Sequence, residues 1–275
     1  MSWNSHYFHY LALLSLIGFG VASIGEMVRY QLKSRNILAC ASTIAFVIGF
    51  GACIAVELSL LVVDSEGRIS HPLAGFLLAS LLSVGVLYLR FVRKLDLITV
   101  LASPVITLIL FIQIFFVPTA RLHATLTASG MATSLSFHIY ASVFGQACAI
   151  LAAVVSACYL FVDYHVKRKN MIFLMQSSSS LKTLKNLMLG LLWCGFIFMS
   201  IGLVSGAYLA LFHSELLQDF NTSVKTSWAL AVWLWYLLTL FFYSVLNTHV
   251  TRVAKMAMIG FVLISLPFYG VFFKI

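Results

Sequence analysis

The feature that most constrains this chain is a series of eight long apolar runs, each able to cross the roughly 30 Å of hydrocarbon in a bilayer. Lipid offers no partners for backbone polar groups, so such runs fold as α-helices with internal hydrogen bonds. Only 9% of the residues are charged, against about 25% in a soluble domain. We therefore predict an all-α fold, a polytopic membrane helix bundle with eight transmembrane helices. They are expected near residues 8–28, 37–63, 72–91, 96–117, 135–163, 187–212, 228–247 and 256–273.

Lysine and arginine are distributed unevenly over the loops between these runs. When successive loops are assigned to alternate sides, the 17 basic residues divide 13 to 4. The positive-inside rule makes the richer side cytoplasmic, which predicts that the N and C termini are both outside. The net charge of +9 therefore follows the membrane, and we expect no nucleic-acid partner. The inner group is Arg29, Lys33, Arg35, Arg90, Arg93, Lys94, Lys167, Arg168, Lys169, Lys182, Lys185, Arg252 and Lys255, and the outer group is Arg68, Arg121, Lys225 and Lys274.

The chain is expected to form one integral membrane domain over residues 1–275. We predict two helical halves at about 1–163 and 187–275, joined by a basic cytoplasmic linker at 164–186. The linker contains Lys167, Arg168 and Lys169, and such a cluster is typical of contact with anionic lipid headgroups.

Six of the eight histidines fall on the predicted outer side. Histidine is scarce in lipid-spanning segments unless it faces the bundle interior or water, so this concentration suggests a site there. His138 stands out because it lies in the first turn of the fifth predicted helix. Small residues lie on the same helix face as His138 and form a stripe along it. Such a stripe admits a neighbouring helix or a flat ligand, and we favour helix packing as its interpretation. Gly202 and Gly206, a G-x-x-x-G pair on the sixth run, indicate a close helix contact. The stripe is His138, Ser142, Gly145, Ala149, Ala152 and Ser156.

A Trp-Ala-Leu-x-x-Trp-x-x-Tyr segment, Trp228–Tyr236, lies directly behind a polar loop at 213–227. At that place it resembles the penultimate helix of the cytochrome c assembly family, the polytopic haem-handling proteins of the CcsA and CcmC kind. The resemblance is best from about Ala132 to the C terminus. In the first half, His71-Pro-Leu73 and the acidic Glu57 are similar to family features.

The chain also departs from the family pattern. The loop at 213–227 contains no tryptophan, whereas haem-exporting members carry a tryptophan-rich signature there. The second predicted helix lacks the histidine expected in it, and Phe241 stands where a family histidine falls. In family members of the synthase type a second outer histidine lies near the C terminus, and this chain has no counterpart of it. The sequence is therefore most similar to the short, tryptophan-poor branch of HemX-like and YpjD-like membrane proteins.

The resemblance implies a haem cofactor in a bacterial cytoplasmic (inner) membrane, with His138 as an axial ligand of the haem iron, a role suited to neutral imidazole. His213 is the best-placed second ligand, with His71 and His123 behind it. Trp228 and Trp233 form either an interfacial aromatic belt or a wall against which a porphyrin could stack. Expected partners are haem, the lipid bilayer, and cytochrome c assembly or haem-biosynthesis proteins.

Three functions are compatible with these residues. The leading one is a membrane haem-handling or c-type cytochrome assembly protein with an outer-face haem site. We expect it not to be an enzyme, because no nucleophile–base pair is evident. A scaffold or regulator of haem biosynthesis that binds no haem is the second. The third is a small-solute or ion transporter using Glu57, which lies well inside the second predicted helix, where a charge costs at least about 2.5 kcal/mol unless paired or hydrated.

Overall fold

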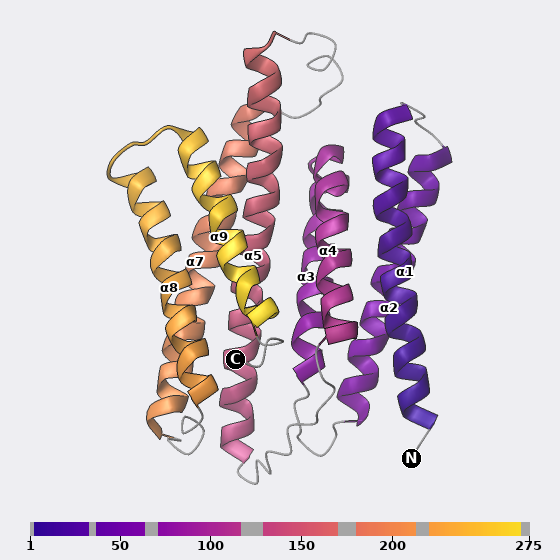
Figure 1. Ribbon diagram of the computed structural model, residues 1–275, viewed down its shortest axis with the longest axis vertical. Helices are drawn as coiled ribbons and strands as arrows, with labels where there is room; N and C mark the ends of the chain where they lie inside the picture. Colours follow the sequence, from indigo (N-terminus) through magenta and orange to yellow (C-terminus); the bar gives the residue numbers. More distant parts are fainter. Residues whose placement is uncertain are drawn as a thin grey trace. The chain divides into compact units, whose positions relative to one another are not determined.

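The computed structural model describes residues 3–32, 37–63, 71–116, 129–169, 180–212 and 220–270. Over these ranges the chain forms eight α-helices and no strand (Figure 1). The predicted all-α fold is confirmed. The helices are α1 (Trp3–Leu32), α2 (Ile37–Val63), α3 (His71–Phe91), α4 (Asp96–Phe116), α5 (Ser129–Lys167), α7 (Leu181–Phe212), α8 (Phe220–Ser244) and α9 (Val250–Gly270).

Seven of these helices, α1 to α5, α7 and α8, are long and apolar enough to cross a membrane. Their apolar segments range from 18 residues in α3 to 34 in α5, and about 20 residues suffice for a crossing. The chain is therefore a polytopic helical membrane protein. Helix α9 begins with Arg252 and Lys255 in its first two turns, and its membrane crossing stays a prediction.

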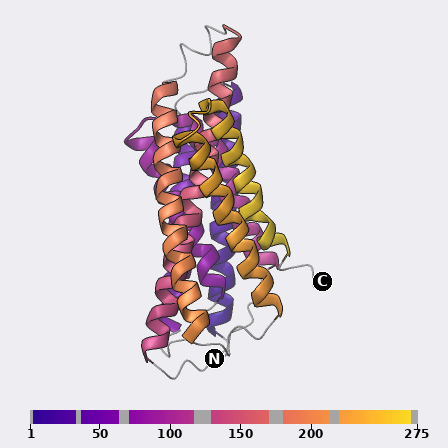
Figure 2. The ribbon, with the colours of Figure 1, turned by 90° about the vertical axis from the view of Figure 1, so that its left-hand side faces the viewer.

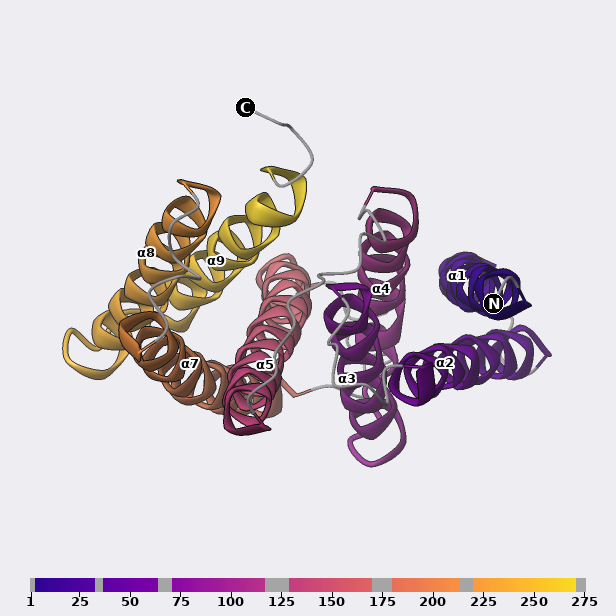
Figure 3. The same ribbon diagram turned by 90° about the horizontal axis from the view of Figure 1, so that it is seen from below.

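The helices pack as two compact units, residues 1–127 (unit 1) and 128–275 (unit 2). In unit 1, α1 packs against α2 and α4, while α3 packs against α2 and α4. In unit 2, α5 packs most extensively on α7 and also on α9, and α8 packs on both α7 and α9 (Figures 2 and 3). Within the described ranges each unit therefore holds four helices, and α5 packs with those that follow it.

This grouping differs from the predicted halves, which placed the fifth helix in the first half. Apolar periodicity marks where a helix runs but does not identify its neighbours, and here the contacts of α5 decide its place. The predicted linker at 164–186 is partly helical, because α5 continues to Lys167 and α7 begins at Leu181. The integration of both units into one domain stays a prediction.

Glycines bring the helix backbones into contact in both units. In unit 1, a Cβ added to Gly18 of α1 would lie 2.7 Å from the Cα of Gly49 in α2. In unit 2, a Cβ on Gly145 of α5 would lie 2.8 Å from the backbone nitrogen of Met199 in α7. Helix association in lipid depends on such close van der Waals packing, because there is little hydrophobic driving force between helices. The small-residue stripe of α5 thus packs on α7, as its favoured interpretation predicted.

Unit 1 contains a buried group of charges centred on Glu26, which is only 1% exposed. Arg90 of α3 places a guanidinium nitrogen 2.7 Å from one Glu26 oxygen, and Ser42 of α2 donates a 2.8 Å hydrogen bond to the same oxygen. Arg29 lies 3.2 Å from the other Glu26 oxygen and 3.2 Å from Asp96 of α4. This group, the Glu26 network, joins the four described helices of unit 1, α1 to α4.

Candidate functional site

His138 occupies a defined position at the contact between α5 and α7. Its Nδ1 lies 2.8 Å from the carbonyl oxygen of Gly202 and 3.2 Å from the hydroxyl of Ser205. A carbonyl only accepts hydrogen bonds, so Nδ1 carries the hydrogen and donates it. In the neutral ring, Nε2 then holds a free lone pair. No residue in the described part of the chain hydrogen-bonds this Nε2.

Two glycines of α7 make room for this arrangement. A Cβ on Gly206 would lie 2.7 Å from Cε1 of the His138 ring, and a Cβ on Gly202 would lie 2.5 Å from the Ser142 hydroxyl. The predicted G-x-x-x-G contact is therefore confirmed, and it has a local purpose. Without side chains at these two positions, α5 approaches closely enough for the imidazole to reach the α7 backbone.

An apolar groove of about 670 Å³ lies beside His138, between α5 and α7. Its volume falls within the range of small-molecule sites, roughly 300–1,000 Å³. Ser205, the hydroxyl partner of His138, lines the groove, and Phe137 precedes His138 in the chain. The lining is Ser134, Phe137, Ser200, Ile201, Val204, Ser205 and Tyr208. The histidine and the groove thus share one end of the α5–α7 pair.

The tryptophans of α8 use their indole N–H groups inside unit 2. Trp233 donates a 2.8 Å hydrogen bond to Ser200, which lines the groove, and its ring stacks on Phe196 with centroids 5.5 Å apart. Trp228 donates to the backbone carbonyl of Leu263 in α9 at 2.9 Å. Trp233 is therefore connected to the groove through one hydroxyl, whereas Trp228 ties α8 to α9. Their contact with a porphyrin stays a prediction.

The side chains of the other predicted ligands lie outside the described structure. His213 and His123 lie outside the described residues. His71 begins α3 in unit 1, and its side chain is also outside the described part. No group of three or more histidine, cysteine or acidic side chains that could hold a metal ion occurs within the described residues.

Glu57 is half-buried in α2 and accepts a hydrogen bond from the hydroxyl of Ser80 in α3. Ser80 also lies 3.4 Å from the sulfur of Cys53, one turn before Glu57. The carboxylate is thus satisfied by a neighbouring helix of unit 1. This hydrogen bond gives Glu57 a role in the packing of α2 on α3, and its use in transport stays a prediction.

Sequence reasoning did not identify Ser205 or the Gly202 carbonyl as partners of His138. The G-x-x-x-G pair was a signal for close approach of α7, but its register against His138 is a property of the packed helices. Arg90 was counted only as a cytoplasmic charge, because its partner Glu26 is 64 residues away in the chain.

Comparison with known proteins gives one match, and it covers the chain. The family described as Cytochrome C assembly protein matches residues 5–275. No curated protein and no solved structure matched significantly. The match agrees with the resemblance at Trp228–Tyr236 and with the polytopic helical fold. The chain belongs to the cytochrome c assembly protein family.

Proposed function

We propose that this protein handles haem for c-type cytochrome assembly in a bacterial cytoplasmic membrane, and that His138 supplies an axial ligand to the haem iron. Family membership supports the assembly role. The observation that carries the ligand assignment is the 2.8 Å bond from Nδ1 of His138 to the Gly202 carbonyl. Histidines that bind metals commonly donate their second ring N–H in this way, which fixes the tautomer and ring orientation.

The residues around His138 fit a haem group. Neutral imidazole is a standard axial ligand, and bound haem would supply the iron centre that the His138 imidazole ligates. The adjacent groove of about 670 Å³ presents apolar side chains such as Phe137, Val204 and Tyr208. Gly206 allows the ring to lie against α7. In this proposal the chain ligates, orients and shields the group from water, as a protein does for a cofactor.

A second axial ligand would complete a bis-histidine site. We propose His213 first, because it directly follows Phe212, the last residue of α7, and the groove lies toward that end of α7. His71 and His123 are the alternatives. Trp233 is proposed to hold the groove wall in place through Ser200.

The test is a visible spectrum and a pyridine haemochrome assay on detergent-purified protein, with His138→Ala beside wild type. We expect a Soret band in wild type that is lost or shifted in His138→Ala, because the iron loses a nitrogen ligand. His165→Ala is the matched control. His165 lies on the same helix, and its Nδ1 also contacts a carbonyl, that of Phe161 at 2.9 Å, so its removal should leave the spectrum unchanged.

Identical spectra in His138→Ala and wild type would contradict the ligand assignment. Wild-type protein without haem, even after expression with excess haem, would favour the scaffold function. A His213→Ala variant, compared in the same assay, tests the proposed second ligand separately.

The outer location of this site is a second proposal, based on the division of basic residues. We expect the loop between α8 and α9 to be cytoplasmic and both termini to be outside. A single cysteine at Asn247, in a variant without native cysteines, should resist a membrane-impermeant maleimide in intact cells and react after the cells are opened. Labelling in intact cells would show that the orientation is the opposite of the one proposed, with His138 on the cytoplasmic side.

A further inference from the structure

A second cavity lies at the opposite end of α7 from His138, in unit 2. It measures about 350 Å³ and is lined by Lys185 of α7, by Tyr243 and Ser244 of α8, and by residues 247–250. The apolar segment of α8 ends at Ser244 and that of α7 begins at Leu181. The cavity therefore lies where the chain leaves the hydrocarbon, at the depth of lipid headgroups.

The connection between α8 and α9 has a fixed shape. Asn247 adopts a left-handed conformation, with φ of 47°. The backbone N–H of Thr248 bonds to the carbonyl of Phe242 at 3.2 Å, and the Thr248 hydroxyl donates to that carbonyl at 2.9 Å. These two bonds close the turn that follows α8, and asparagine is one of the few residues that adopt the left-handed conformation readily. The cavity wall formed by residues 247–250 is thus held by hydrogen bonds.

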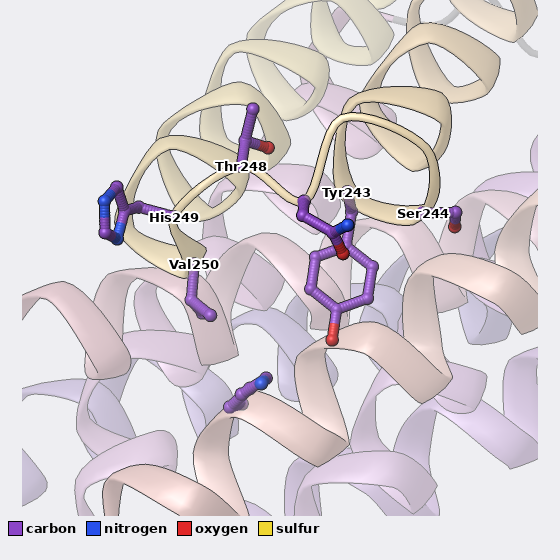
Figure 4. Close-up of a pocket in the computed structure, with 7 residues that line it drawn as sticks. Tyr243, Ser244, Thr248, His249 and Val250 are labelled. Atoms are coloured by element: carbon purple, nitrogen blue, oxygen red, sulfur yellow. The ribbon is translucent and has the colours of Figure 1, made fainter.

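Lys185 is held at the cavity by an aromatic ring. Its ammonium nitrogen lies 5.8 Å from the ring centroid of Tyr243, within the range of a cation–π contact. Figure 4 shows the Tyr243 phenol and the Val250 side chain extending from the same side of the turn, whereas His249 and Ser244 point outward on either side. Lys185 and the Tyr243 hydroxyl therefore offer a cation and a hydrogen-bond donor to the same space, with His249 at its rim.

No acidic side chain lines this cavity among the described residues. Unit 2 contains three acidic residues in sequence, and the one within the described structure, Asp163, is paired with Lys167 at 2.6 Å. Lys182 adds positive charge at the start of α7, and Arg252 and Lys255 add it at the start of α9. A cation in a concave, hydrogen-bonding site without a counter-charge favours an anion.

We propose that this cavity binds a phosphate-bearing anion, with Lys185 as its principal cation and the Tyr243 hydroxyl as a donor. Basic pockets between transmembrane helices on the cytoplasmic side are suited to phosphate headgroups. An anionic phospholipid and a soluble phosphate compound present the same chemistry, and the test distinguishes these two sources. The site is independent of the haem proposal, because it shares no residue with His138 and its groove.

The test uses delipidated full-length protein in detergent and measures thermal unfolding during separate titrations with short-chain phosphatidylglycerol, phosphatidylcholine and inorganic phosphate at constant ionic strength. We expect phosphatidylglycerol to bind wild type more tightly than phosphatidylcholine. Lys185→Gln should weaken phosphatidylglycerol binding about fivefold, the effect of one basic residue near a membrane surface. Lys185→Arg should retain binding.

Lys182→Gln is the matched control. It removes the same charge as Lys185→Gln, but Lys182 lies one helical turn before Lys185 and does not line the cavity. A loss in Lys182→Gln equal to that in Lys185→Gln would overturn the proposal and leave only general surface charge. Equal binding by Lys185→Gln and wild type would also overturn it. If inorganic phosphate stabilises wild type and this stabilisation is lost in Lys185→Gln, the site is assigned to a soluble phosphate compound. If phosphatidylglycerol stabilises the protein and inorganic phosphate does not, the site is assigned to lipid.

Discussion

Arg90→Met is expected to lower the free energy of unfolding of unit 1 by about 3–5 kcal/mol, the usual cost of removing one partner from a buried ion pair. Glu26 is 1% exposed, and Arg90 is its closest cation, at 2.7 Å. The variant leaves a carboxylate inside the helix bundle with Arg29 as its remaining charged partner. The measurement is unfolding of the purified protein from detergent into mixed micelles of increasing dodecyl sulfate content.

Arg93→Met is the control for this variant, because Arg93 is exposed and lies three residues further along the chain. It should cost much less. The double variant Glu26→Gln with Arg90→Met should recover part of the loss, since no unpaired carboxylate then remains. Equal stability of the two single variants would show that the Glu26 network does not hold unit 1 together.

The second large effect is expected at the contact between α5 and α7. In Gly145→Val the new Cβ would lie 2.8 Å from the backbone nitrogen of Met199. A backbone atom cannot move to another rotamer, so the helices must separate, at a cost of about 3 kcal/mol or more, the upper part of the range for overpacking. Because His138 bonds to the backbone of α7, the same separation should reduce haem binding in the spectral assay described above.

Gly190→Val provides the control for this second effect. Gly190 is in α7, and a Cβ added there meets nothing within 4 Å. This variant carries the same change in helix propensity without the clash. If Gly190→Val lowered the stability and the haem content as much as Gly145→Val, the close contact of α5 and α7 would not be the cause.

Most of the helices could be predicted from the sequence because each is determined by a local property, a run of apolar residues longer than a membrane is thick. The predicted runs at 37–63 and 72–91 lie within one residue of α2 (Ile37–Val63) and α3 (His71–Phe91). Helix ends were less accurate where amphipathic turns continue beyond the apolar run, as in α5, which extends to Lys167.

Helix partners could not be predicted in the same way. The pairing of Arg90 with Glu26 depends on which helices lie side by side, and a single sequence contains no signal for it. His138 was identified by its place in the predicted outer turn of a helix and by the family resemblance. Its bond to Gly202 depends on the register between α5 and α7. The grouping of α5 with the later helices depends on packing as well.

The hydrogen bond from His138 to a backbone carbonyl has a consequence for mutational tolerance. A side-chain acceptor can be deleted by one substitution, and a carboxylate acceptor loses its charge when it is protonated. The carbonyl at position 202 is an acceptor at every pH at which the helix is folded, and a substitution of Gly202 acts on the bond only through the clash of its side chain with Ser142. The orientation of the imidazole is therefore encoded in the spacing of two helices, and it can be changed only by moving them.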